Sequence, residues 1–160
     1  MKLYIKQKVF SWRDRFAVYS ESRRDRWFAQ GEIFTLGRKL HVYDASGAEV
    51  AFIRQKILSF LPRYYIVTGG REYEFVKEFT LLRPKYTIRN LGWTVDGNFW
   101  EHDYAVTDER GVIMRISKAW LTWGDFYELD IYDAGDELLC VCVALAIDCI
   151  TADRESAAAK

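Results

Sequence analysis

Residues 138–150 limit the fold of this chain more than any other segment, with the run Leu-Leu-Cys-Val-Cys-Val-Ala-Leu-Ala-Ile-Asp-Cys-Ile. Twelve of its thirteen positions are apolar and do not alternate with polar ones, and the run is longer than a typical buried strand. Asp136 and Glu137 place negative charge just before it, where the N-terminus of a helix carries partial positive charge. These features predict a helix over 138–150.

A helix that is apolar on every face must be enclosed. Thirteen residues at a rise of about 1.5 Å each span only about 20 Å, whereas the hydrocarbon core of a bilayer is about 30 Å thick. Protein rather than lipid is therefore expected to surround this helix. The segment should be a buried helix that forms the core of the fold.

Apolar and polar residues alternate through most of positions 2–132, which is the period of half-buried strands. Turn-forming residues at 44–47, 68–70, 96–98, 108–111 and 133–135 separate such segments. The pattern predicts antiparallel hairpins that meander through a curved sheet around the helix. The clearest strands are Leu3–Ile5, Phe16–Tyr19, Trp27–Leu36, Leu40–Tyr43, Val50–Ile57, Tyr64–Thr68 and Tyr73–Phe79.

The length of 160 residues fits one domain. No proline-rich or serine-rich linker interrupts the sequence, so we expect a single domain over 1–155 and a disordered tail over 156–160. The three cysteines lie between 140 and 149 in the most apolar segment, which indicates reduced core residues rather than a disulfide framework or a metal site. The N-terminus lacks the apolar run of a secretory signal, and a cytoplasmic protein is expected.

Charge excludes some classes of partner. Lys plus Arg and Asp plus Glu both number 23, so no long-range field steers the protein to nucleic acid or to an anionic bilayer. Nucleic-acid binding is not expected, and binding to an anionic surface would need a local patch of charge.

Three segments carry a resemblance to a known family. They are Gly-Arg-Lys-Leu-His-Val-Tyr-Asp-Ala-Ser-Gly at 37–47, Val-Ala-Phe-Ile-Arg-Gln-Lys-Ile-Leu-Ser-Phe-Leu-Pro-Arg-Tyr at 50–64, and the closing Ile-Asp-Cys-Ile at 147–150. With them the chain resembles the LURP-one-related family from Tyr4 to Asp153, and it looks close to bacterial members. That family is related in fold to the tubby C-terminal domain and the phospholipid scramblases. The resemblance implies a mainly β fold, a closed antiparallel barrel of about twelve strands around a central hydrophobic C-terminal helix.

The resemblance says less about function, because a fold does not confer an activity. Plant relatives are linked to pathogen defence, tubby domains bind phosphoinositides, and scramblases move lipids. The lipid-binding strand of tubby carries a Gly-Lys-x-Arg pattern, whereas the matching stretch here is Gly31-Glu32-Ile33-Phe34. Both basic positions are absent, so phosphoinositide binding at that site is not expected. The membrane-anchoring helix and cysteine tract of scramblases have no counterpart.

The sequence contains no set of residues with the spacing of a catalytic or metal site. His41 and His102 are about 60 residues apart, and neither has a second histidine or a cysteine at metal-ligand spacing. Cys140 and Cys142 would face nearly opposite sides of a helix, which does not fit a redox pair. We therefore expect no metal site, no cofactor and no catalytic residue.

A cationic face is the best candidate site. Five basic residues come from neighbouring predicted strands and could bind an anionic head group or a nucleotide: Arg38, Lys39, Arg54, Lys56 and Arg63. Ordinary solvated strand faces explain the same charges. Asp148 interrupts the apolar run, either as a buried carboxylate poised for a ligand or as a mark of where the helix reaches the barrel mouth.

The sequence therefore predicts a non-enzymatic binding module whose partner is an anionic lipid or a protein, without a membrane-spanning segment. Two alternatives stay open. One is a small-ligand or enzymatic site at a barrel end that uses Asp148 or His102, and the other is a structural adaptor whose activity lies in its partner.

Overall fold

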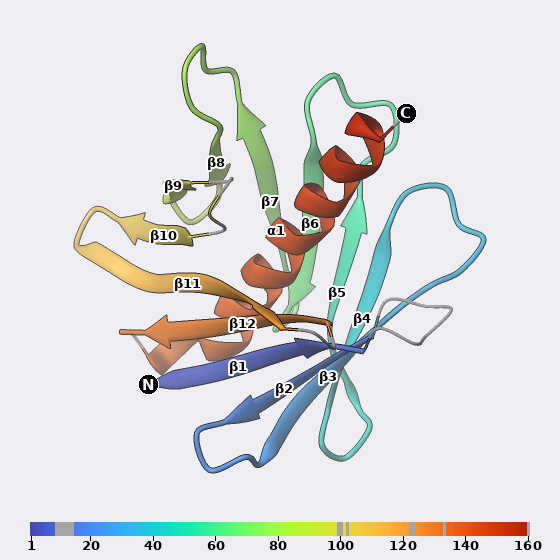
Figure 1. Ribbon diagram of the computed structural model, residues 1–160, viewed down its shortest axis with the longest axis vertical. Helices are drawn as coiled ribbons and strands as arrows, with labels where there is room; N and C mark the ends of the chain where they lie inside the picture. The colour runs from blue at the N-terminus through green and yellow to red at the C-terminus, as the bar shows by residue number, and fades with distance from the viewer. Residues whose placement is uncertain (9–14, 99–100, 102, 122–123, 133, 160) are drawn as a thin grey trace.

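A computed structural model of the chain describes residues 1–8, 15–98, 101, 103–121, 124–132 and 134–159. These residues form a β-barrel around a long C-terminal helix (Figure 1). A short 3₁₀ turn, Ala134–Asp136, leads into the helix α1, Glu137–Ala158. The strands are β1 Lys2–Gln7, β2 Arg15–Ser20, β3 Asp25–Gly31, β4 Lys39–Asp44, β5 Glu49–Gln55, β6 Arg63–Thr68, β7 Arg71–Glu78, β8 Lys85–Ile88, β9 Trp93–Asn98, β10 Asp103–Asp108, β11 Gly111–Leu121 and β12 Gly124–Ile131.

The strands follow one another around the barrel in chain order. Each pairs antiparallel with the next, and β1 pairs with β12 to close the sheet, so that the described residues form a twelve-stranded closed barrel. Buried and outward-facing residues alternate along the strands, as in β4, where Leu40 and Val42 face inward. The fold predicted from the resemblance is confirmed.

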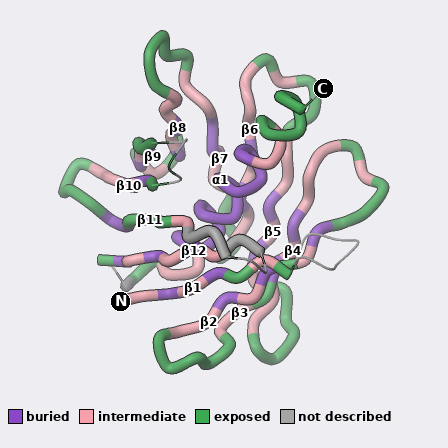
Figure 2. Tube along the Cα trace, viewed as in Figure 1, coloured by how far each residue is buried: buried purple, intermediate pink, exposed green. Residues whose placement is uncertain are grey.

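The helix α1 occupies the interior of this barrel. Its residues Leu139–Thr151 are all buried (Figure 2), and inward side chains of the strands surround them. The helix begins at Glu137, whose carboxylate accepts a hydrogen bond from the Arg26 guanidinium at 2.7 Å. An enclosed apolar helix over 138–150 is therefore confirmed, and the three cysteines along it are free and buried.

The helix extends further than the apolar run. It continues to Ala158, so residues 156–158, expected in a disordered tail, lie in its last turn. Beyond Thr151 the segment Ala-Asp-Arg-Glu-Ser-Ala-Ala has no large apolar side chain, and this part of α1 leaves the barrel interior, as the exposed end in Figure 2 shows. Apolar patterning marks only the enclosed part of a helix, which explains the early predicted end.

The predicted turn at Asp96-Gly97-Asn98 is wrong, because these residues are the last of β9 and pair with β10. Gly97 stands opposite Tyr104. A Cβ atom at Gly97 would lie 2.2 Å from the carbonyl oxygen of Asp103. Glycine is required here for two strands to approach closely rather than for a turn.

Because each strand runs antiparallel to the next, the loops that connect them alternate between the two ends of the barrel. We call the loops 32–38, 56–62 and 79–84 the loop end, because each follows an odd-numbered strand and all three surround the C-terminal end of α1 (Figure 1). The opposite end, with tight turns at 21–24, 45–48, 69–70 and 109–110, is called the turn end. The residues that matter below lie at the loop end.

Candidate functional site

Large apolar side chains protrude from the loop end. The most exposed ones in the described residues all lie there: Phe34, Leu36, Leu58, Phe60, Phe79, Leu81 and Leu82, each with at least 76% of its surface exposed. Ile33 and Ile57 add to them at lower exposure. Scattered apolar residues are normal on a protein surface, but clustered ones mark an interaction site. The three loops together therefore form the candidate functional surface.

Two of these loop tips hold an unusual backbone conformation. Phe34 has φ of 60° and Leu58 has φ of 58°, in the left-handed region that bulky residues rarely adopt. Such a conformation costs about 1–3 kcal/mol and persists only where the surroundings impose it. Both side chains are fully exposed, so neither gains core packing in return.

Basic residues accompany the apolar tips. The loops 32–38, 56–62 and 79–84 each contain one basic residue, Arg38, Lys56 and Arg83, and the acidic residue among them is Glu32. Lys56 and Arg83 are exposed, and neither forms an ion pair with any residue that the structure describes. The loop end therefore combines protruding apolar groups with uncompensated positive charge.

The predicted cationic face is largely neutralised by the protein itself. Lys39 and Arg54 are cross-strand partners on the outer wall. However, Lys39 Nζ lies 3.4 Å from Glu32 Oε2, and Arg54 Nη2 lies 2.9 Å from Glu72 Oε2. Arg54 also stacks over the ring of Tyr65, 4.2 Å from its centroid. The structure thus brings these two residues together while supplying each with its own carboxylate.

The other members of the predicted set separate. Arg63 pairs with Glu74 at 2.8 Å, whereas Arg38 leaves the wall and bonds to Asp153 of the helix. Lys56 alone stands exposed in a loop without an ion pair among the described residues. Of the five predicted residues, it is the one placed at the candidate surface with its charge available.

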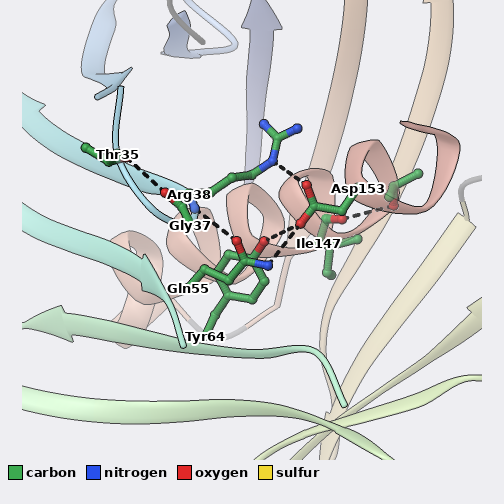
Figure 3. Close-up of polar contacts among 8 residues, drawn as sticks. Thr35, Gly37, Arg38, Gln55, Tyr64, Ile147 and Asp153 are labelled. Carbon is green, nitrogen blue, oxygen red and sulfur yellow. Dashed lines mark hydrogen bonds and ion pairs between the residues drawn. The ribbon is translucent and has the colours of Figure 1, made fainter. Parts of the chain in front are cut away.

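A polar cluster, which we call the Asp153 latch, ties the helix end to the barrel wall beneath the loops (Figure 3). Asp153 accepts hydrogen bonds from Arg38 Nε at 2.7 Å, Tyr64 Oη at 2.9 Å and Gln55 Nε2 at 3.3 Å. The Gln55 side chain also accepts the backbone N–H of Arg38 at 2.9 Å. Burial, together with the nearby Cys149 and Asp153, raises the pKa of Tyr64 well above its usual range. Arg38 is therefore a structural residue of the latch.

Asp148 does not mark the barrel mouth, since it is buried within the helix with only 7% of its surface exposed. Tyr127 of β12 donates a hydrogen bond to it at 2.5 Å. A carboxylate in an apolar interior needs such a partner. His102, the other residue of the alternative site, lies outside the described residues.

His41 lies on the outer wall between two carboxylates. Its Nε2 is 2.7 Å from Glu32 and its Nδ1 is 3.1 Å from Glu49. Burial lowers the pKa of His41, but the hydrogen bonds to Glu32 and Glu49 more than offset this and raise it overall. Both nitrogens donate only in the charged ring, so this arrangement favours the imidazolium.

The described part of the chain offers no candidate for metal binding or for thiol chemistry. It contains no group of three or more His, Cys, Asp and Glu residues arranged to hold a metal ion. Burial raises the pKa of Cys142 to about 12, which makes this thiol a poor nucleophile. Among the described helices, none is long and apolar enough to cross a membrane.

A hollow on the outer wall is a separate feature. It measures about 710 Å³ and lies where β1, β2 and β12 adjoin. The rings of Tyr4, Tyr19 and Phe126 pack against one another there, with Tyr4 centroids 5.7 and 5.5 Å from the other two. Its charged lining combines Lys6 and Arg23 with acidic residues, so it shows no preference for an anion.

Several loop-end residues continue the alternating pattern of the strands before them, so the sequence did not mark them as a functional surface. Ile33–Leu36, Ile57 and Phe79 were expected to continue the strands now known as β3, β5 and β7. One signal could have separated them: each apolar cluster is followed by a basic residue, with Pro62 and Pro84 closing two of the loops.

Comparisons with known proteins agree with the fold. A family model described as LURP-one-related matches residues 1–148. The uncharacterized protein YxjI of Bacillus subtilis (strain 168) is 38% identical over 156 residues, which cover 97% of this chain and 96% of that protein. The X-ray structure of a protein from Arabidopsis thaliana superposes with a TM-score of 0.60 at 12% identity, covering 92% of this chain and 90% of that one. At this identity the plant structure supports the fold alone.

Proposed function

Because the chain belongs to the LURP-one-related family and encloses the apolar part of its helix, we propose that it is a non-enzymatic binding module that holds its partner at the loop end. The observation that carries the proposal is the concentration of the most exposed apolar side chains on three neighbouring loops. Exposed apolar surface costs free energy in water unless a partner covers it. A monomer gains nothing from placing Phe34, Phe60 and Leu82 there.

Several features support binding rather than catalysis. The interior is occupied by α1, and its acidic residue Asp148 is engaged by Tyr127. The Asp153 latch fixes the end of the helix beneath the loops, so that they project from a braced base. Buried free thiols fit a reducing compartment, and the proposal places the protein in the cytoplasm.

Photo-crosslinking in the native cell tests the proposal. Benzoylphenylalanine would replace Phe60 or Leu82 at the loop end, and Ala45 or Tyr132 near the turn end as matched controls. All four positions are exposed, so the fold should tolerate the label. We expect adducts to a protein or a lipid from the loop-end positions only. Equal labelling from both ends, or no adduct from the loop end, would contradict the proposal.

A further inference from the structure

We propose that the partner of the loop end is an anionic lipid bilayer. The apolar tips of the three loops insert among the acyl chains, and Lys56 and Arg83 lie against the phosphates of the head groups. This inference rests on the proposed function and names the partner for the same surface. It differs from the cationic wall expected from the sequence, because apolar tips rather than paired arginines make the contact.

The shape of the surface favours a fluid partner. The apolar groups stand on three separate loops, and Phe34, Leu58, Phe60, Leu81 and Leu82 each expose at least 91% of their surface. A protein partner would need a matched pocket for each protruding side chain. A bilayer needs none, because acyl chains rearrange around each tip, and apolar side chains penetrate about 5–10 Å into the interfacial region.

The charges of the surface favour an anionic partner. The acidic residue within the three loops is Glu32, and it is paired with Lys39 and His41 of the wall. Lys56 and Arg83 adjoin the apolar tips and lack ion-pair partners in the described chain. Basic residues next to inserted apolar groups meet the phosphate layer of a membrane. Lysine is depleted in the cores of protein interfaces. Lys56 lies directly beside the apolar tip of its loop, so it suits a phosphate layer better than the core of a protein interface.

The turn end provides an internal comparison. Its turns and the strand residues beside them carry both signs of charge, with Asp44, Asp108 and Glu109 near Arg24, Arg71 and Arg110. Asp44 and Asp108 accept backbone hydrogen bonds from their own turns. The described large apolar residues near that end, Met1, Val112 and Tyr132, are 43%, 38% and 57% exposed. Since the chain has no net charge, attraction to a negative surface must be local, and the loop end is where positive charge and apolar tips coincide.

Vesicle flotation of the full chain tests the inference. The vesicles are phosphatidylcholine alone, or phosphatidylcholine with phosphatidylglycerol. The tip variant carries Phe60→Ser and Leu82→Ser, and its control carries Val112→Ser and Tyr132→Ser. The charge variant carries Lys56→Gln and Arg83→Gln, and its control carries Arg24→Gln and Arg71→Gln at exposed positions of the turn end.

We expect the wild type to float with the anionic vesicles and to bind the neutral ones at least about tenfold more weakly. The tip variant should lose at least about tenfold in partition because two inserted side chains are removed. The charge variant should lose at least about tenfold on anionic vesicles. Both controls should bind like the wild type. A circular dichroism spectrum and melting curve like those of the wild type establish that each variant is folded.

Three results would overturn the inference: no flotation of the wild type with anionic vesicles, equal flotation of the tip variant, or equal binding to neutral and anionic vesicles. The crosslinking experiment separates these failures from failure of the proposed function. Protein adducts from Phe60 and Leu82 without vesicle binding would leave the loop end as a binding surface and reject the bilayer as its partner.

Discussion

Replacing Asp153 by alanine should destabilise the protein by removing the acceptor at the centre of the latch. Tyr64 is fully buried and would lose the carboxylate to which its hydroxyl donates. Such a loss costs about 1–3 kcal/mol. The ion pair with Arg38 involves side chains that are 29% and 38% exposed, so solvent screening limits its contribution to at most about 1 kcal/mol. We expect the free energy of unfolding to fall by about 1–4 kcal/mol in total.

Urea denaturation followed by circular dichroism measures this loss. Glu155→Ala is the matched control, because Glu155 is an exposed acid on the same helix, and surface substitutions usually change stability by less than about 0.5 kcal/mol. Tyr64→Phe completes a double-mutant cycle, in which the coupling with Asp153 should be about 1 kcal/mol or more. Equal stabilities of Asp153→Ala and Glu155→Ala, or a coupling near zero, would refute the argument that the latch braces the loop end.

Two further predictions concern the interior and the outer wall. Ala144→Lys should prevent soluble folding, because Ala144 is buried inside the barrel and an unpaired charge there is costly, whereas Ala157→Lys at the exposed helix end should fold; a soluble, cooperatively unfolding Ala144→Lys protein would argue against the enclosed helix. His41→Gln tests the pH dependence of stability. The pKa of His41 is raised from 6.5 in the folded protein, so its stabilising contribution is present below that value and is lost as pH rises through the folded-state pKa. The stability difference between wild type and variant, measured by urea denaturation, should therefore shrink from about pH 5.5 to about pH 8, and a difference that is constant or grows would contradict the bridge to Glu32 and Glu49.

Periodicity predicted the wall of the barrel well because strands repeat every two residues whatever their neighbours are. Leu40 and Val42, or Tyr64 and Ile66, follow the alternation and face inward. The apolar helix could be predicted equally well, since a helix without a polar face must be enclosed by other parts of the protein. The pairing of β1 with β12 could be predicted only from the family resemblance, because the two strands lie at opposite ends of the sequence.

The same periodicity misplaced the loop end. Apolar residues at the end of a strand continue the pattern whether they face the core or the solvent, so Ile33–Leu36 and Ile57 were assigned to strands. Tertiary structure ends β3 at Gly31 and β5 at Gln55 and leaves the following apolar residues exposed. Hydrophobicity alone therefore could not distinguish a core residue from one that awaits a partner.

Charge pairing was also beyond the sequence. Lys39 and Arg54 were grouped correctly on one face, but their carboxylates come from Glu32 and Glu72, which strand register brings close. Arg38 finds its carboxylate on Asp153, 115 residues away. Lys56 has no ion-pair partner among the residues that the structure describes, and this became visible only once the partners of Lys39, Arg54 and Arg63 were known.

Hydrogen–deuterium exchange with and without anionic vesicles can show whether the loop end contacts the bilayer, because it maps the contact along the whole chain in the native protein. We expect slower amide exchange at 33–38, 56–62 and 79–84 when phosphatidylglycerol vesicles are present, with no change at 45–48 and 109–110. Protection confined to the turn end or to the outer wall around Arg54, or no protection anywhere, would contradict this expectation.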